Sequence, residues 1–167
     1  MIMLFVFVEG MDDKRFFEWY FKKNNLVKII TYKQMKKEKI NNFLSSITSM
    51  KDSDYVFLAD SDTKNVEERK KEVDSKYKRC DLEKIFIVET EIESWYLAGL
   101  DNNREYKYMK IKNLENTDHI TKEDFNNMIN IKEKTNIFIE ILKNFDRSIA
   151  RNKNTTFKIF DESRIAV

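Results

Sequence analysis

The chain has 167 residues, of which 41% are hydrophobic, 13% aromatic and 36% charged, and its formal net charge is +2. This length allows one folded domain with a buried core, and the absence of proline together with only two glycines excludes a flexible linker. A single cysteine, Cys80, excludes an internal disulfide, and a single histidine, His119, excludes the zinc sites that need several such ligands.

Apolar runs alternate with helical patterns over the first hundred residues. Runs of about five apolar residues predict strands, and apolar residues at helical spacing between them predict helices. The predicted strands are 4–8, 28–32, 55–59 and 84–88, and the predicted helices are 12–25, 36–50, 65–78 and 92–100. Strands joined by helical crossovers lie parallel, with helices on both faces of the sheet. We therefore predict an α/β fold with a four-stranded, mostly parallel sheet.

The strand signal fades beyond Asp101. Residues 121–131 and 132–149 look helical, whereas 155–165 show no clear preference. We expect one domain over 1–167, with an α/β core at 3–100 and a mainly helical C-terminal extension at 101–167. The sequence leaves open whether these helices cover the sheet edge, pair two subunits of a homodimer or admit substrate.

No segment approaches the ~20 apolar residues that a transmembrane helix needs. The apolar run at the N-terminus lacks a preceding basic region and reaches Glu9 almost at once, so it does not resemble a signal peptide. We therefore expect a cytoplasmic protein that has no membrane partner.

Carboxylates follow three of the predicted strands. Glu9 follows the first strand, Asp60 and Asp62 follow the strand at 55–59, and Glu89 and Glu91 follow the last one. The carboxyl ends of parallel strands emerge at one edge of the sheet, which is where ligands bind in open α/β sheets. We expect these acids to lie in one neighbourhood.

Such a cluster needs compensation, because two like charges about 4 Å apart repel by roughly 4 kcal/mol at an effective dielectric constant of 20. The acids must share protons, face basic side chains or hold a cation. Hard oxygen ligands without thiols or imidazoles suit Mg²⁺, Mn²⁺ or Ca²⁺. We predict a divalent metal site.

The charge is unevenly distributed along the chain. Residues 14–51 contain ten basic and two acidic residues, a balance of +8, and residues 52–105 contain nine basic and fifteen acidic residues, a balance of −6. A basic segment beside an acidic site suits a metal-dependent enzyme that acts on a polyanion such as a nucleic acid. A lysine-rich solvated surface would give the same balance.

Structural roles compete with functional ones for several acids. Glu9 and Gly10 could form a turn with glycine in an unusual conformation, and Asp12 and Asp13 suit a first helical turn. Asp60 and Asp62 could cap the next helix. The pattern from Thr90 to Glu93 matches a capping box, which leaves Glu89 and Glu91 as the better ligand candidates. Trp95, on the apolar face of its predicted helix, suits core packing.

The segment Val8-Glu9-Gly10-Met11-Asp12-Asp13, followed by Asp60-Ser61-Asp62 after a later strand, resembles the TOPRIM signature of a glutamate and a later Asp-x-Asp. The segment Val88–Leu97 is similar to a Glu-rich stretch that precedes a tryptophan in small stand-alone TOPRIM-like proteins related to OLD-family nucleases. The resemblance covers about residues 3–100.

The resemblance implies Glu9 as a general acid/base or metal ligand, and Asp60 and Asp62 as Mg²⁺ or Mn²⁺ ligands. It further implies that Glu89, Glu91 or Glu93 completes a second metal position. A basic residue can stabilise the transition state in nucleases of this fold, and Arg151 and Lys153 are the candidates. The expected activity is hydrolysis of phosphodiester bonds in DNA or RNA, in a role such as defence against phage.

Two alternatives stay open. The first is a non-catalytic subunit that binds metal or nucleic acid within a larger defence complex containing an ATPase. The second is a haloacid-dehalogenase-like phosphatase with Asp60 as nucleophile and Asp62 as acid. The second alternative fits less well, because Lys64 stands where that family has threonine and the motif does not follow the first strand.

Overall fold

The computed structural model describes residues 2–111, 113–163 and 165. The described residues divide into two compact units, the first running to Ile87 and including Ile165, and the second beginning at Val88. The boundary expected near residue 100 from the sequence thus lies inside the second unit.

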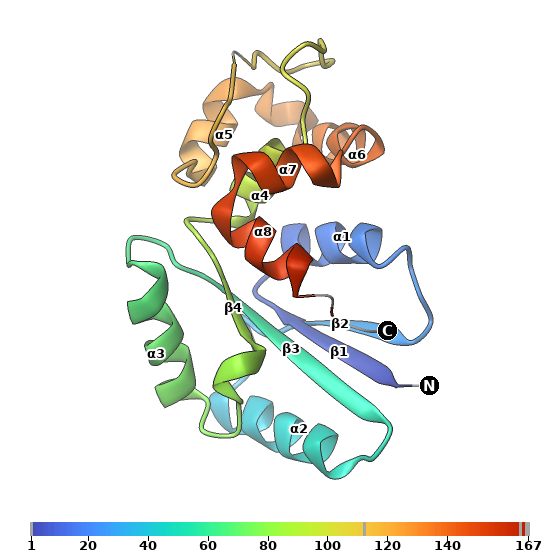
Figure 1. Cartoon of the computed structure of the whole chain (residues 1–167), viewed down its shortest axis with the longest axis vertical. Helices are drawn as coiled ribbons and strands as arrows, with labels where there is room; N and C mark the ends of the chain where they lie inside the picture. Colours follow the sequence, from blue (N-terminus) through green and yellow to red (C-terminus); the bar gives the residue numbers. More distant parts are fainter. Residues whose placement is uncertain (1, 112, 164, 166–167) are drawn as a thin grey trace. The chain divides into compact units, whose positions relative to one another are not determined.

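The first unit carries the sheet (Figure 1). Strand β1 pairs in parallel with β2 on one side and with β3 on the other, and the strand order is β2-β1-β3-β4. The predicted four-stranded α/β fold is confirmed. Its elements are β1 (Met3–Val8), α1 (Met11–Tyr20), β2 (Val27–Thr31), α2 (Lys37–Ser49), β3 (Ser53–Asp60), α3 (Val66–Lys76), the 3₁₀ turn η1 (Leu82–Lys84) and β4 (Ile85–Val88).

Helices cover both faces of the sheet, and Figure 1 shows α1 and α2 on opposite sides of the strands. Strand β1 is central and buried on both faces, which explains why Leu4–Val8 is a continuous apolar run rather than an alternating one. Helix α1 ends at Tyr20, earlier than predicted, because Lys22 and Lys23 take left-handed φ angles of 52° and 50°.

The core under α2 and α3 is aromatic. The Phe57 ring lies 4.5 Å from the Tyr32 ring, 5.0 Å from that of Tyr77 and 5.6 Å from that of Phe7, measured between centroids. Cys80 belongs to the same cluster. Burial raises the pKa of its thiol to about 12, so the group is protonated and packs as a small apolar side chain.

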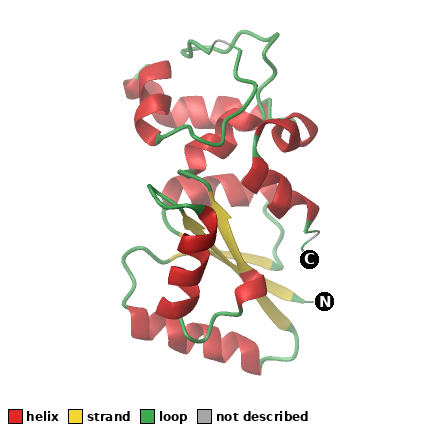
Figure 2. Cartoon of the chain, turned by 60° about the vertical axis from the view of Figure 1, so that its left-hand side comes forward, coloured by secondary structure: helices red, strands yellow, loops and turns green. Residues whose placement is uncertain are grey.

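The second unit is helical apart from its loops (Figure 2). Its elements are α4 (Ile92–Ala98), α5 (Lys122–Met128), the 3₁₀ turn η2 (Ile131–Glu133), α6 (Lys134–Lys143), α7 (Arg147–Lys153) and α8 (Thr155–Glu162). The single helix predicted over 132–149 is divided into α6 and α7, because Asp146 accepts a hydrogen bond from the Ile149 amide and starts a new helix. The ambiguous segment 155–165 contains α8.

Helix α4 lies at the centre of this unit, in contact with α5, α6 and α7. The Trp95 ring packs 5.3 Å from the Phe157 ring, and the Tyr96 ring packs 4.3 Å from the Phe138 ring, between centroids. Trp95 is fully buried, so the predicted core role of this side chain is confirmed.

Gly99, directly after α4, allows a close approach of Phe145. A Cβ at position 99 would lie 2.3 Å from the Phe145 ring. We expect Gly99→Ala to lower the free energy of unfolding by about 1–3 kcal/mol, because the half-buried Phe145 ring, which packs against Phe157, must move. Urea denaturation measures this change, with the exposed helical substitution Ser148→Ala as a control expected to stay within about 0.5 kcal/mol. An unchanged midpoint for Gly99→Ala would show that the ring has room to shift.

The helices of the described residues are short. The longest, α2, has 13 residues, whereas a membrane span needs about 20. Over residues 2–111, 113–163 and 165, none combines the length and the apolar composition that a bilayer requires.

Candidate functional site

Residues that follow three adjacent strands of the first unit meet at the carboxyl edge of the sheet. Glu9 follows β1, Tyr32 follows β2, and Asp60 ends β3. The Tyr32 amide donates to the carbonyl of Val8 (2.9 Å), so the chain segments that leave β1 and β2 stay together. The parallel pairing of the strands thus brings Glu9 and Asp60 into contact, as expected from the order of the elements.

The Glu9 carboxylate is held by three donors on one oxygen. Its Oε1 accepts hydrogen bonds from the Asp60 amide (3.2 Å), the Tyr32 hydroxyl (3.5 Å) and the Arg69 guanidinium (3.4 Å). The side chain is only 16% exposed. No donor among the described residues reaches Oε2, so this oxygen is available to a proton or a cation.

Arg69 supplies a positive charge inside the acidic site. Its Nε donates to the Asp60 carbonyl (2.8 Å), and another guanidinium nitrogen donates to Glu72 (2.9 Å). Hydrogen bonds from Lys64 and Arg69 lower the pKa of Glu72 to about 2, so Glu72 is ionised and anchors the guanidinium. The negative charge of Glu9 could be compensated by a shared proton, a basic side chain or a bound cation. The structure shows the second of these, since Arg69 lies 3.4 Å from Glu9.

Arg69 escapes sequence reasoning because it lies in a highly charged helix. The available signal is its spacing. It stands three residues after Val66 and four before Val73, and residues at this spacing share one face of a helix. Val73 is buried in the core and Val66 packs against it. A basic residue on the apolar face of a predicted helix indicates a buried or partly buried charge, and Arg69 has that position.

Tyr32 is a fixed hydrogen-bond donor at the site. Its single hydroxyl hydrogen is shared between the Leu58 carbonyl (2.7 Å) and Glu9 (3.5 Å), with the shorter contact to Leu58 as the main hydrogen bond. Burial, and next the charges of Glu9 and Asp60, raise the pKa of Tyr32 well above its ordinary value. The phenol therefore stays protonated.

Asp60 and Asp62 do not cap the following helix. Asn65 caps α3 by accepting a hydrogen bond from the Glu68 amide (2.8 Å). Asp60 is buried, whereas Asp62 is exposed and has a left-handed φ of 52°. Aspartate tolerates this conformation better than most residues, and it turns the chain out of β3. The capping alternative is thus wrong for both residues.

The turn after Glu9 needs no unusual glycine conformation. Gly10 has an extended φ of −142°, and its amide donates to the Asp13 carboxylate (3.1 Å). Asp12 forms an ion pair of 2.7 Å with Arg15 in the same helix. Asp12 and Asp13 therefore have structural roles in the first turn of α1, as the alternative reading expected.

A pocket of about 430 Å³ opens beside these residues, a size within the usual range for small-ligand sites. It combines acidic and basic side chains with a wall of buried tyrosines. The lining residues are Glu9, Tyr32, Lys33, Met35, Lys37, Asp62, Arg69, Val73, Lys76 and Tyr77.

The acidic side chains of the pocket fit one mode of divalent-metal binding and not another. In the part of the chain that the structure describes, no group of three or more His, Cys, Asp or Glu side chains is arranged to hold a metal ion. Mg²⁺ usually needs only one or two carboxylates, because waters and substrate phosphates supply its other ligands. Glu9 and Asp62 line the same pocket and offer hard oxygen donors, so they fit this open mode of binding. They do not form a closed cage.

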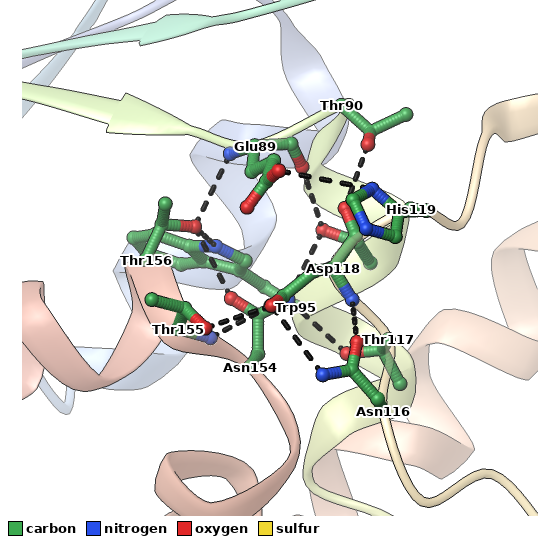
Figure 3. Close-up of polar contacts among 11 residues, drawn as sticks. Glu89, Thr90, Trp95, Asn116, Thr117, Asp118, His119, Asn154, Thr155 and Thr156 are labelled. Carbon is green, nitrogen blue, oxygen red and sulfur yellow. Dashed lines mark hydrogen bonds and ion pairs between the residues drawn. The ribbon is translucent and has the colours of Figure 1, made fainter. Parts of the chain in front are cut away.

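Glu89 lies in a polar cluster of the second unit (Figure 3). Its amide donates to the Thr156 hydroxyl (3.1 Å), and its carboxylate lies 3.7 Å from the exposed His119 ring. Burial, and next the charge of Asp118, raise the pKa of Glu89. His119 reaches Glu89 from the loop before α5.

The predicted capping box from Thr90 to Glu93 is wrong. Thr90 has a φ of 66° and donates to the Asp118 carbonyl (2.7 Å), and Glu91 is the residue at the cap of α4. Glu93 instead forms a buried ion pair of 3.2 Å with Lys134. Glu91 accepts a hydrogen bond of 2.6 Å from the Lys122 amide at the start of α5. The predicted role of Glu89 and Glu91 as metal ligands stays a prediction.

Arg151 and Lys153 have partners within the second unit. Arg151 donates to the buried Asp161 carboxylate (2.6 Å). Lys153 is buried, donates to the Leu100 carbonyl and to Asn102 (2.9 Å), and has its pKa lowered by burial. Their predicted contact with substrate stays a prediction, and their hydrogen bonds to Asp161, Leu100 and Asn102 stabilise the second unit.

The carboxyl edge of the sheet in the first unit is therefore the candidate functional site, because it combines the Glu9 carboxylate, the Arg69 guanidinium and a pocket. Comparison of the chain with protein-family models, with curated proteins and with solved structures found no match.

Proposed function

We propose that the protein is a Mg²⁺- or Mn²⁺-dependent nuclease of the TOPRIM type that hydrolyses phosphodiester bonds in DNA or RNA. The observation that carries the proposal is the pocket in which Glu9 and Asp62 stand beside Lys33, Lys37, Arg69 and Lys76. Carboxylates that can bind a metal and cations that can neutralise phosphate are the two requirements of this reaction.

The strand order supports the same proposal. Glu9 and Asp60 follow β1 and β3, which are neighbouring parallel strands. The TOPRIM pattern seen in the sequence calls for a glutamate and an Asp-x-Asp at one sheet edge. The Asp60 amide also donates to the Glu9 carboxylate, which couples the two positions directly.

A bound divalent metal would neutralise the phosphate, activate water and stabilise the leaving oxygen. Glu9 and Asp62, with Asp60 at the end of β3, would hold it. Neighbouring residues of the chain set the orientation of the Glu9 carboxylate. Tyr32 and the Asp60 amide fix the orientation of Glu9 through Oε1, which leaves Oε2 to accept a proton or face a cation.

The direct test is incubation of the purified protein with plasmid DNA, single-stranded DNA and RNA in Mg²⁺, Mn²⁺ or EDTA. We expect cleavage of at least one substrate in the presence of metal and none in EDTA. Protein that is folded and binds nucleic acid but cuts no substrate with either metal would contradict the nuclease proposal.

One observation favours a second candidate function. The Arg69 guanidinium already compensates Glu9, at 3.4 Å. This arrangement suits a module that binds nucleic acid without cutting it, as a subunit of a larger assembly with an ATPase in defence against phage. Binding without cleavage in the same assay, together with capture of such a partner, would favour this function over the first.

A further inference from the structure

Three lysines that line the pocket have no carboxylate partner among the residues that the structure describes. They are Lys33 two residues after β2, Lys37 at the first position of α2 and Lys76 at the last position of α3. Each is exposed, and none forms a salt bridge within the described residues. Arg69, by contrast, is committed to Glu9 and Glu72.

The position of Lys37 points to an external anion. Helix N-termini favour negative charge, because the helix dipole places partial positive charge there. Lys36 and Lys37 at the start of α2 add two positive charges to that end against the one negative charge of Glu38, and no side chain caps the helix. Lysines at this helix end, next to an open pocket, offer a binding site for phosphate.

The walls of the pocket indicate which part of a nucleic acid it would hold. Tyr32 and Tyr77 are only 6% and 5% exposed, and each packs against Phe57 in the core. Buried rings cannot serve as stacking platforms for bases, which single-strand binding proteins use for that purpose. The pocket therefore offers charge to a phosphate backbone, whereas its two tyrosines are too buried to stack with a base. The ring centre of Tyr77 lies 5.3 Å from the Lys76 ammonium.

We propose that Lys33, Lys37 and Lys76 form a phosphate subsite that binds the sugar-phosphate backbone of a nucleic-acid strand beside Glu9 and Asp62, irrespective of base sequence. This inference rests on the proposed function and assigns its substrate contacts to the first unit, at residues that sequence analysis did not single out.

Fluorescence anisotropy with labelled 12-residue single-stranded DNA in EDTA tests the subsite without cleavage. The variant Lys33→Gln/Lys37→Gln is compared with Lys28→Gln/Lys51→Gln. The control pair has the same change of charge, but Lys28 and Lys51 are exposed residues near the amino ends of β2 and β3, away from the pocket.

We expect the pocket variant to bind at least about tenfold more weakly than the wild type and the control to change less than about twofold. Because each phosphate contact to a single strand contributes about 0.7 to the slope of log K against log salt, the pocket variant should lose about 1.4 from that slope. Oligonucleotides of dT and of mixed sequence should bind within about threefold of each other.

Equal losses in both variants would overturn the subsite, because they would reflect overall charge alone. A mononucleotide that binds while the oligonucleotide does not would show a nucleotide site instead of a strand site. Lysine-dependent binding with no cleavage in any metal would refute the nuclease and support the subsite. Cleavage that is unaffected by the lysine substitutions would support the nuclease and refute the subsite.

Discussion

Replacement of Glu9 by glutamine is expected to reduce metal-dependent cleavage at least about 100-fold while leaving the fold intact. Glutamine has the same shape, and its carbonyl oxygen can still accept the hydrogen bonds that reach Oε1 from Tyr32 and the Asp60 amide. What the variant loses is the negative charge and the free carboxylate oxygen. Initial rates of cleavage in Mg²⁺, together with circular dichroism spectra, separate the chemical effect from unfolding.

The matched control is Glu83→Gln. Glu83 is an exposed glutamate in η1, which precedes β4 and so lies at the amino end of that strand. Its substitution makes the same chemical change away from the carboxyl edge, and we expect a rate within about twofold of the wild type because exposed positions tolerate such changes. Full activity of both Glu9→Gln and Asp60→Asn would contradict the assignment of the active site to this sheet edge.

Replacement of Phe57 by alanine is expected to lower the free energy of unfolding by about 3–5 kcal/mol, the usual cost of removing a buried phenylalanine. Phe57 is fully buried at the centre of the aromatic core, where its ring contacts those of Tyr32, Tyr77 and Phe7. The cavity left by the ring cannot close easily, because the surrounding side chains are held by the strands and by α2 and α3.

Urea denaturation followed by circular dichroism measures the effect, and Met50→Ala is the control. Met50 is 51% exposed at the end of α2, so its truncation should cost less than about 0.5 kcal/mol. Tyr32 packs on Phe57 and contacts Glu9. The Phe57 variant should therefore also cleave nucleic acid more slowly in buffer without urea. A loss of stability below about 1 kcal/mol would show that the aromatic cluster is less tightly packed than its geometry indicates.

Local sequence patterns determined the elements of the sheet. The apolar run Leu4–Val8 predicted a buried strand because a central parallel strand is covered on both faces, and β1 has that position. Element ends were harder to predict. The end of α1 depends on left-handed residues at Lys22 and Lys23, and lysine carries no preference for that conformation.

The start of α4 was predicted wrongly, because distant residues bind the side chains that match the capping box. Thr90 and Glu93 match a capping box, but Thr90 is held by the distant Asp118 carbonyl and Glu93 by Lys134. Both partners come from segments more than twenty residues away, which a short motif cannot include. Asn65, rather than Asp60 or Asp62, caps α3 for a local reason, because the helix begins only at Val66.

The sequence by itself determined that this chain forms a parallel α/β sheet and that Glu9 and Asp60 lie at one edge of it, because strand periodicity and crossover geometry suffice for both. Only the tertiary structure decided that Arg69, sixty residues from Glu9, provides its counter-charge, and that Lys33, Lys37 and Lys76 share a pocket with it. These contacts depend on which face of α3 packs on the sheet and on how the loops after β2 and β3 turn. Long-range packing sets both, and local pattern does not encode them.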